Sequence, residues 1–367
     1  MRRTPIGLWV GTSALLVFLA GAQCQGPQGD ENPGPPEEQS NQGDTSGDHG
    51  VGGGNQGDNS SGQDDSGRPE GAGYVTFRLP DGHVYRIEAE RGAVPEDISV
   101  ALNQLGVGSD NWLNISPDGA WLLLDTERFD ADCAGYGCLA IVDARVTGAE
   151  SVRADGHVVH PWSFGAVASG GGLIVYPDTG GPHDVDLWAI RRGDAGWTTP
   201  LLLTGASTYP FNSHPALSAD GSKVVFDGGP VPYGQEGTAI CEVSTDGTGF
   251  RVVLTTADAP PGLPVRGALH HPDYAPDGSV VFEGDWDGEQ IWRLPPGASV
   301  PVRVARPDSG NDNSPCVLPD GRIVSLLIGQ AGGTDNHNLK VMEADGSNPF
   351  ILYDKGDVID GGIGCGG

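Results

Sequence analysis

The most informative stretch of this chain is His214-Pro215-Ala216-Leu217-Ser218-Ala219-Asp220-Gly221-Ser222-Lys223-Val224-Val225-Phe226. It reads as a short strand, a tight turn and a second strand. Asp-Gly is a strong hairpin signal, because a type I′ turn needs a positive φ at both of its central residues. The stretch therefore predicts a β-hairpin whose first strand contains His-Pro.

The same hairpin recurs along the chain. Full copies occupy residues 114–123, 271–282 and 314–324, and a degenerate copy extends from His160 to Tyr176. The turns fall near positions 118, 171, 220, 277 and 320, a period of roughly 40–60 residues. A third and a fourth strand follow, as at residues 339–342 and 350–352. Such repeats predict the blades of a β-propeller, which bury their faces by stacking around an axis.

Two features of the repeat carry a family resemblance. Ser116-Pro117-Asp118-Gly119 precedes a β-rich run, and a later strand ends in Ala344-Asp345-Gly346-Ser347-Asn348. Over residues 112–352 this pattern resembles the TolB-like propeller repeat. The resemblance implies an all-β, six-bladed propeller of the exported bacterial lipoprotein type. It does not identify a function, because this repeat occurs in binding modules and in enzymes alike.

The two ends of the repeat region predict how the ring closes. Residues 74–79 and 83–88 flank another Pro-Asp-Gly turn and read as the first strands, and we take residues 98–105 as a further strand. Residues 358–365 resemble the start of a sixth innermost strand that lacks a partner. Pairing the C-terminal strand with the N-terminal strands removes exposed sheet edges. We therefore expect six blades, with seven as the alternative if residues 74–105 form more than one partial blade.

The N-terminal region reads as an export signal and a tether. Residues 1–23 combine Arg2 and Arg3 with an apolar run, as in a signal peptide. Either Ala20-Gly21-Ala22 is the cleavage site, or Cys24 becomes a lipid-modified N-terminus, although Gln23 replaces the usual small residue before it. Residues 24–72 are polar and rich in Gly, Asp and Ser, which predicts a disordered tether. The propeller domain is expected at residues 73–367 of an exported protein, either a cell-envelope lipoprotein or a secreted or periplasmic protein.

The net charge of the chain limits the classes of partner that it is expected to bind. It has 20 basic against 49 acidic residues, a formal net charge of −29. This excess argues against nucleic acid, whose binding needs clustered Lys and Arg, and against anionic membrane surfaces. We expect a monomer that contacts a membrane only through an N-terminal lipid. The sequence contains no Gly-x-Ser-x-Gly elbow, Walker A loop or His-Glu-x-x-His motif.

The six cysteines suggest disulfides, which export permits. Cys133 and Cys138 bracket a short loop and are expected to form a local disulfide, the alternative being half of a metal site. Under the closure above, Cys316 and Cys365 lie on innermost strands of neighbouring blades and are candidates for a second disulfide. Cys241 lies in the middle of a strand and is expected to be a buried thiol.

Three histidines precede a proline in the repeat: His160, His214 and His271, with Ser314 in a fourth copy. Equivalent residues of successive blades form a ring at the mouth of the central channel. Converging imidazoles can bind a divalent transition metal, and a ring of this kind holds a divalent ion in propeller lyases that act on acidic sugars. The alternative is structural: the histidine bonds a neighbouring loop, and the proline ends the ladder.

These observations lead to two functional hypotheses. The first is a non-catalytic binding scaffold without a cofactor, which recognises an unidentified protein or glycan through loops such as residues 129–137, 177–184, 228–237 and 330–336. The second is a metal-dependent polysaccharide lyase, or another propeller enzyme, that uses the histidine ring. The acidic loops at residues 285–289 and 308–313 can hold calcium, but we expect solvated turns there.

Overall fold

The computed structural model describes residues 73–367 except 136, 233–236, 305–310, 330–336 and 360–362. The expected signal peptide, Cys24 and the tether therefore lie outside the described residues. So does the expected loop at residues 330–336. None of the helices in the described part of the chain has the length and apolar character of a membrane span.

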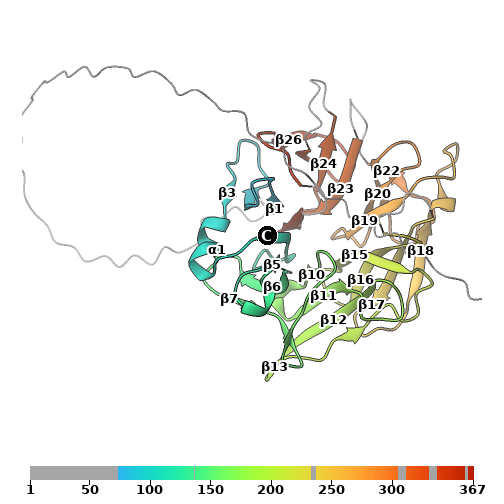
Figure 1. The fold of residues 1–367 in the computed structure, drawn as a ribbon. Helices are drawn as coiled ribbons and strands as arrows, with labels where there is room; N and C mark the ends of the chain where they lie inside the picture. Colours follow the sequence, from blue (N-terminus) through green and yellow to red (C-terminus); the bar gives the residue numbers. More distant parts are fainter. Residues whose placement is uncertain (1–72, 136, 233–236, 305–310, 330–336, 360–362) are drawn as a thin grey trace, which may run out of the picture. The chain divides into compact units, whose positions relative to one another are not determined.

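Six of the sheets formed by the described strands are antiparallel blades of a propeller (Figure 1), and β8 and β9 form a separate two-stranded sheet. Blade 1 contains β4 (Asp110–Ile115), β5 (Trp121–Thr126), β6 (Cys138–Asp143) and β7 (Ala149–Ser151). Blade 2 contains β10 (Ala166–Val167), β11 (Leu173–Asp178), β12 (Asp186–Gly193) and β13 (Gly196–Trp197), and β14 (Leu201–Leu202) also pairs with β12. Blade 3 contains β15 (Phe211–Leu217), β16 (Lys223–Gly229), β17 (Ala239–Ser244) and β18 (Arg251–Thr255).

The remaining blades follow the same order from the axis outwards. Blade 4 contains β19 (Leu269–Tyr274), β20 (Val280–Gly284), β21 (Gln290–Leu294) and β22 (Val302–Arg303). Blade 5 contains β23 (Asn311–Val317), β24 (Ile323–Ile328), β25 (Asn338–Met342) and β26 (Phe350–Tyr353). Blade 6 contains β27 (Gly364–Gly366), β1 (Tyr74–Arg78), β2 (Val84–Glu88) and β3 (Glu96–Asp97). Smaller elements are the hairpin of β8 (Arg153–Ala154) and β9 (His157–Val158), helix α1 (Ser99–Leu105) and the 3₁₀ turns η1 (Ala131–Cys133), η2 (Ser169–Gly171) and η3 (Thr256–Asp258).

The innermost strands contact one another in a closed cycle: β4, β10, β15, β19, β23, β27 and β4 again. The ring closes as expected from the sequence, because β27 pairs with β1 in the register Tyr74↔Gly366 and Thr76↔Gly364. Figure 1 accordingly shows the C-terminus beside β1. One blade is thus built from both ends of the domain.

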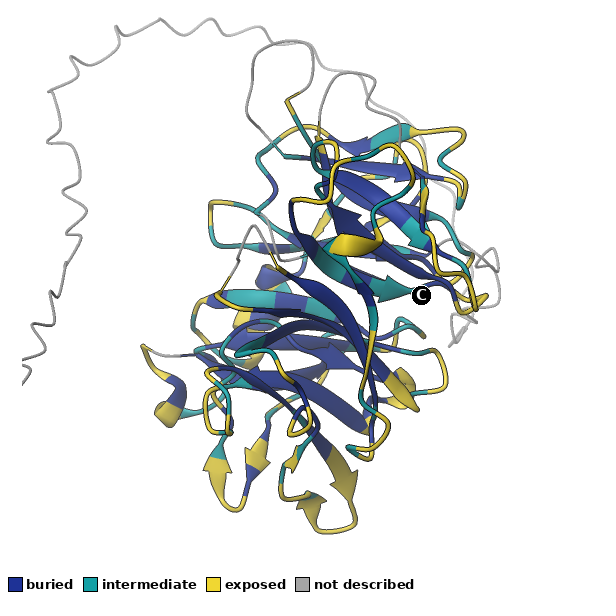
Figure 2. Ribbon diagram, turned by 90° about the vertical axis from the view of Figure 1, so that its right-hand side faces the viewer, coloured by how far each residue is buried: buried dark blue, intermediate teal, exposed yellow. Residues whose placement is uncertain are grey.

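Hydrophobic side chains fill the spaces between neighbouring blades. One such cluster joins Val75 and Phe77 of blade 6 to Leu326 and Val341 of blade 5. Figure 2 shows that most of the strands are buried and that most of the turns and loops at their ends are exposed. Stacked faces therefore supply the core, as the repeat predicts.

The repeat hairpins differ in detail from the expected type I′ turn. Gly221 has a φ of 67°, but Asp220 is not among the residues with positive φ. The Gly221 N–H donates to the Ser218 carbonyl, and the Asp220 carboxylate accepts from the Ser222 N–H at 3.0 Å. Asp220 thus acts as an Asx-type turn residue. The expected turn type is wrong, although the expected hairpin position is confirmed.

Residues 98–105 were expected to be a strand, and this prediction is wrong. Residues 99–105 form α1, which buries Ser99 and Leu102 and leaves Val100 and Leu105 exposed. A spacing of three residues between buried positions suits a helix rather than a strand. Asp97 also favours the helix, because its Oδ1 accepts from the Ser99 N–H at 3.0 Å. The fourth strand of blade 6 is the short β3 instead.

Candidate ligand site in the central channel

The innermost strands of blades 3, 4 and 5 share a β-bulge. In blade 3 the register places His214 and Pro215 opposite Phe226 alone, between the pairs Ser213↔Asp227 and Ala216↔Val225. The bulged residue has a left-handed backbone in all three blades, with φ of 50° at His214, 47° at His271 and 45° at Ser314. A bulge re-aims the side chain and tolerates the missing N–H of proline. The His-Pro pair therefore has a structural role in the repeat.

Hairpin hydrogen bonds identify the equivalent residues in the other blades. In blade 3 the backbone N–H of Ser218 donates to the carbonyl of Lys223. The N–H groups of Ala168 and Ser116 donate in the same way to the carbonyls of Leu173 and Trp121. Counting four residues back from each donor gives a set of equivalent positions: His214, Phe164 and Trp112, joined by His271 and Ser314 in blades 4 and 5. We call these five residues the channel ring.

Neighbouring side chains of the channel ring form an arc. The ring centroids are 6.0 Å apart for Trp112 and Phe164, 5.0 Å for Phe164 and His214, and 4.2 Å for His214 and His271. His271 Nδ1 lies 3.5 Å from Ser314 Oγ. Two of the three predicted histidines are therefore brought together.

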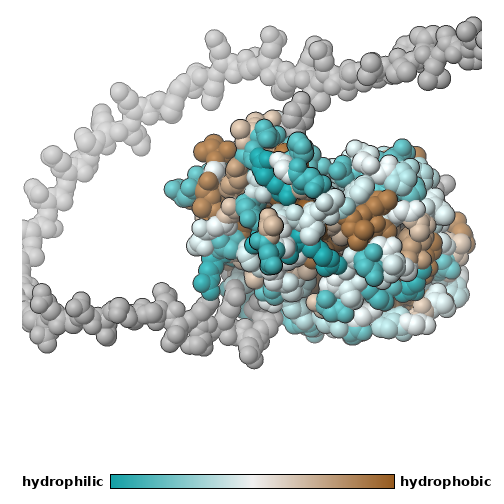
Figure 3. Space-filling model, turned by 90° about the horizontal axis from the view of Figure 1, so that it is seen from below, coloured by the Kyte–Doolittle hydropathy of each residue, from teal (hydrophilic) through white to brown (hydrophobic). Residues whose placement is uncertain are grey.

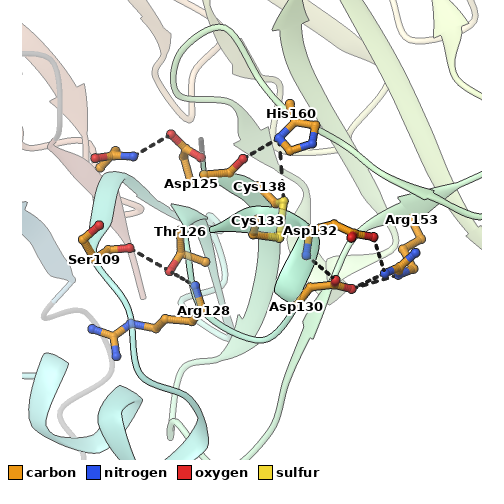
Figure 4. The surroundings of a disulfide bond; sticks show 12 residues. Ser109, Asp125, Thr126, Arg128, Asp130, Asp132, Cys133, Cys138, Arg153 and His160 are labelled. Atoms are coloured by element: carbon orange, nitrogen blue, oxygen red, sulfur yellow. Dashed lines mark hydrogen bonds and ion pairs between the residues drawn. A yellow bond between two sulfur atoms is a disulfide. The ribbon is translucent and has the colours of Figure 1, made fainter. Parts of the chain in front are cut away.

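His160 does not occupy the channel ring, and its expected equivalence to His214 is wrong. It lies four residues before Phe164, and its Nδ1 donates to the Gly137 carbonyl at 2.6 Å. Figure 4 shows it pointing toward Cys138, whose Sγ is 3.8 Å from Nδ1. In the degenerate repeat the His-Pro pair lies four residues farther from the hairpin turn than in blade 3, so His160-Pro161 precedes the short β10.

Two carboxylates that the sequence reasoning missed lie beside the histidines. Asp227 Oδ2 accepts from Nδ1 of His214 at 2.7 Å and from Nδ1 of His270 at 2.9 Å. Its Oδ1 accepts from Ser213 Oγ at 2.8 Å. Asp227 is buried together with His214. One carboxylate thus joins two imidazoles from two blades.

Glu283 plays the corresponding part in blade 4. Its Oε2 lies 3.1 Å from His271 Nδ1 and accepts from the Ser314 N–H at 3.1 Å. The sequence contains a signal for both acids, because the apolar runs Val224-Val225-Phe226 and Val280-Val281-Phe282 are each followed directly by a carboxylate. An acidic residue at the end of such a run marks a buried charge that needs a partner.

Burial and mutual interactions shift the pKa values of Asp227, His214 and His270. Burial opposes ionisation of Asp227, but the charges and hydrogen bonds of His214 and His270 outweigh it and hold the pKa of Asp227 below its usual range. Burial lowers the pKa of His214. Burial also acts against protonation of His270, yet the hydrogen bond to Asp227 outweighs it and raises the pKa of His270. The pKa of His214 and the pKa of His270 are therefore shifted in opposite directions, although both imidazoles bond the same carboxylate.

All six inner strands line a cavity of about 330 Å³. Its wall includes Phe164, His214 and His271 of the channel ring, and further residues such as Asp273 and Cys316. Burial raises the pKa of Asp273 to about 7, although the N–H groups of Val317 and Tyr274 bind its carboxylate. Most of the remaining wall consists of Pro, Ala, Val, Leu and Ile side chains.

Both expected disulfides are present. Cys133 and Cys138 are joined with their Cα atoms 5.2 Å apart (Figure 4), and Cys316 is joined to Cys365 with a Cα separation of 5.6 Å. Cys241 is a buried free thiol, as expected. Disulfides persist in oxidising compartments, so the pair indicates an exported protein.

Solved structures with the same architecture support the fold. A structure described as TolB from Agrobacterium tumefaciens is similar with a TM-score of 0.53 and 18% identity, over 78% of this chain and 90% of that one. The fold is that of a TolB-like six-bladed β-propeller. The similarity does not extend to function at this level of identity.

Two further structures are similar. Hydrazine synthase from Kuenenia stuttgartiensis has a TM-score of 0.54 and 13% identity, over 81% of this chain and 47% of that one. TolB from Acinetobacter baumannii has a TM-score of 0.42 and 15% identity, over 80% and 82% of the two chains. No family model and no curated protein sequence matches the chain.

Proposed function

We propose that this TolB-like propeller is an exported, non-catalytic binding protein that receives a segment of a partner protein in its central channel. The observation that carries this proposal is the cavity of about 330 Å³ at which all six inner strands converge. Mostly apolar cavities with a few converging polar groups are the usual form of a ligand site. The rigid ring supplies the scaffold, and no chemical step is needed.

The lining favours a protein segment over a glycan. Proline and aliphatic side chains make up much of the wall, and Phe164 and His271 add flat rings for stacking. The formal net charge of −29 favours a basic segment over an acidic one. The expected ligand is therefore a basic peptide segment with an apolar or aromatic side chain, bound by a monomeric propeller.

Peptide selection tests this role directly. A random peptide library is selected against the full chain, and the enriched peptides are labelled and titrated by fluorescence anisotropy. Phe164→Ala removes the aromatic contact in the channel and should weaken binding about tenfold or more. Trp197→Ala on β13, at the outer edge of blade 2, is the matched control and should leave the affinity unchanged. Equal affinity for Phe164→Ala and the wild type would reject the channel as the site, and selective binding of oligosaccharides instead of peptides would favour a glycan ligand.

The mode of attachment to the cell belongs to the same proposal. We propose that residues 1–23 direct export, that Cys24 carries a lipid and that residues 24–72 act as a tether. The support is the sequence pattern and the two disulfides of the propeller. Mass analysis of the mature N-terminus in a bacterial host should show a diacylglycerol-modified Cys24. A mature chain that begins after Ala22 without a lipid would show a secreted or periplasmic protein instead.

The enzyme alternative is a metal-dependent polysaccharide lyase. The observation in its favour is the pairing of three imidazoles with Asp227 and Glu283 next to the cavity. A lyase creates a carbon–carbon double bond that absorbs ultraviolet light. A steady rise in absorbance when the chain is incubated with acidic polysaccharides and a divalent metal, lost in Asp227→Asn, would replace the binding role by the enzymatic one.

A further inference from the structure

We infer that His214, Asp227 and His270 form a binding site for a divalent first-row transition metal ion such as Zn²⁺. One ligand atom from each residue can be chosen so that all three lie within 4.8 Å of one another. The inference goes beyond the proposed binding role and does not depend on it, because an ion can occupy this site whether or not a peptide enters the channel.

The distances between the donor atoms are slightly shorter than an ion requires. His214 Nδ1 and His270 Nδ1 lie 2.7 and 2.9 Å from the same oxygen, Oδ2 of Asp227. In the tetrahedral geometry usual for Zn²⁺, two ligand atoms that are each about 2.1 Å from the ion lie about 3.4 Å apart. A metal ion would replace the protons that Oδ2 now shares with the two imidazoles, with small shifts of the side chains.

The donor set identifies the class of metal. Two imidazole nitrogens and one carboxylate oxygen suit Zn²⁺, Fe²⁺ and related ions, whereas Ca²⁺ and Mg²⁺ prefer oxygen ligands alone. Three protein ligands also leave coordination positions for water or for a group of a bound ligand. This set shares only His214 with the three histidines predicted from the sequence. His160 bonds Gly137 and His271 lies beside Glu283, and Asp227 and His270 take their places.

The surrounding structure holds the ligands in place. Ser213 Oγ donates to Oδ1 of Asp227 at 2.8 Å and so orients the carboxylate. Partners of this kind commonly hold metal ligands in position. His214 is fixed by its left-handed backbone at the bulge and is only 3% exposed. The ligands are therefore arranged before an ion arrives.

The site joins two blades. His214 and Asp227 belong to β15 and β16 of blade 3, whereas His270 belongs to β19 of blade 4. An ion that binds only the folded ring raises the thermal midpoint in proportion to the logarithm of its concentration above Kd. At a hundredfold excess over Kd we expect a rise of about 5 °C.

The first experiment uses the full chain without a histidine tag. The protein is treated with chelator, titrated with Zn²⁺, Mn²⁺, Co²⁺ or Ni²⁺, and followed by thermal melting and by metal analysis after dialysis. We expect one retained ion per chain, a raised thermal midpoint and, with Co²⁺, a visible absorption spectrum. Absence of a retained ion and of a melting shift with all four metals would overturn the inference.

Variants then locate the site. His270→Gln and Asp227→Asn should lose the ion and the melting shift, whereas His160→Gln should retain both and serves as the matched control. An ion that persists in both site variants, or that is lost in His160→Gln, contradicts the assignment. If the site variants fail to fold, X-ray absorption of the wild-type Zn²⁺ complex decides: two imidazoles and an oxygen ligand support the site, and any set without two imidazoles rejects it. Repeating the peptide titration with chelator shows separately whether the ion contributes to the binding role.

Discussion

His214 adopts a backbone conformation that a residue with a side chain rarely takes. Its φ is 50°, and the residues at the same place in the next two blades, His271 and Ser314, share this conformation. Left-handed backbone costs roughly 1–2 kcal/mol for such a residue. Three repetitions of this cost around one cavity indicate that the bulge is needed to direct these side chains at the channel.

The residues of the site could be predicted only in part. The His-Pro dipeptide marked His214 and His271, because it recurs at the same position of the repeat. His160 carried the same signal but not the same position. Asp227 and His270 were missed, because register and bulges, rather than spacing in the sequence, place them against His214.

Asp125 is a buried carboxyl whose titration should make the stability of the protein depend on pH. Its burial raises the pKa of the carboxyl to about 6, and its Oδ1 has no hydrogen-bond partner among the described residues. The folded state binds this proton more tightly than the unfolded state, so its contribution to stability is present below about pH 4 and is lost as the pH rises through about 6.

Asp125→Asn should therefore stabilise the protein at pH 8 by roughly 2 kcal/mol and flatten the dependence on pH between about 4 and 6. Urea unfolding at a series of pH values measures both. The amide can still accept from Asn111, which bonds Oδ2 at 3.3 Å. A variant with lower stability at pH 8 and the same pH dependence as the wild type would contradict this account.

At the scale of the element, the closing strand β27 consists of Gly364, Cys365 and Gly366. A Cβ added to Gly366 would overlap the carbonyl oxygen of Ser116 at the end of the first hairpin strand of blade 1. The glycines thus allow β27 to approach the backbone of the next blade.

Gly366→Ala should lower the thermal midpoint by several degrees, because the backbone carbonyl of Ser116 cannot easily shift to make room for the added methyl group. Gly180→Ala is the matched control, since a Cβ there meets no atom within 4 Å. Equal melting of both variants would show that β27 does not pack as described.

Hairpins and helix α1 show why some elements were predictable and others were not. Each Pro-Asp-Gly or Ala-Asp-Gly phrase specifies a turn by local chemistry, so the four full copies were found at the right place. Residues 98–105 carry no such signal, and tertiary burial of Ser99 and Leu102 decides in favour of a helix. The turn type also depends on a carboxylate that binds the Ser222 N–H, which Asp-Gly alone does not reveal.

The two disulfides should differ in how much they contribute to the stability of the whole propeller. Cys316–Cys365 spans 49 residues, whereas Cys133–Cys138 spans 5. In the chain-entropy model the larger loop stabilises by about 4 kcal/mol and the smaller by about 2 kcal/mol. The larger one also links β23 to the closing strand β27.

Replacing Cys316 and Cys365 together by Ser should therefore lower the stability in urea more than replacing Cys133 and Cys138 together. Both cysteines of a disulfide are replaced together, so neither double variant leaves half of a disulfide as an unpaired thiol. The two variants can therefore be compared directly. A larger loss from the Cys133 and Cys138 variant would indicate that ring closure does not depend on the Cys316–Cys365 link.

The distribution of hydrophobic side chains on the surface indicates where a partner could bind. Figure 3 shows a face on which hydrophilic side chains predominate and hydrophobic ones gather in small patches. Val94 and Val107 are large hydrophobic residues that lie exposed on loops. Individual exposed residues of this kind are ordinary on a protein surface and do not mark a binding site.

Photo-crosslinking inside the producing cell tests most directly whether the central channel is the functional site. A photoreactive phenylalanine analogue replaces Phe164 in the channel ring in one version of the protein and Trp197 at the outer edge of blade 2 in another. After illumination, we predict that position 164 forms a discrete covalent adduct with a partner polypeptide and that position 197 does not. The opposite pattern, with an adduct at position 197 and none at 164, would contradict the assignment of the channel as the binding site.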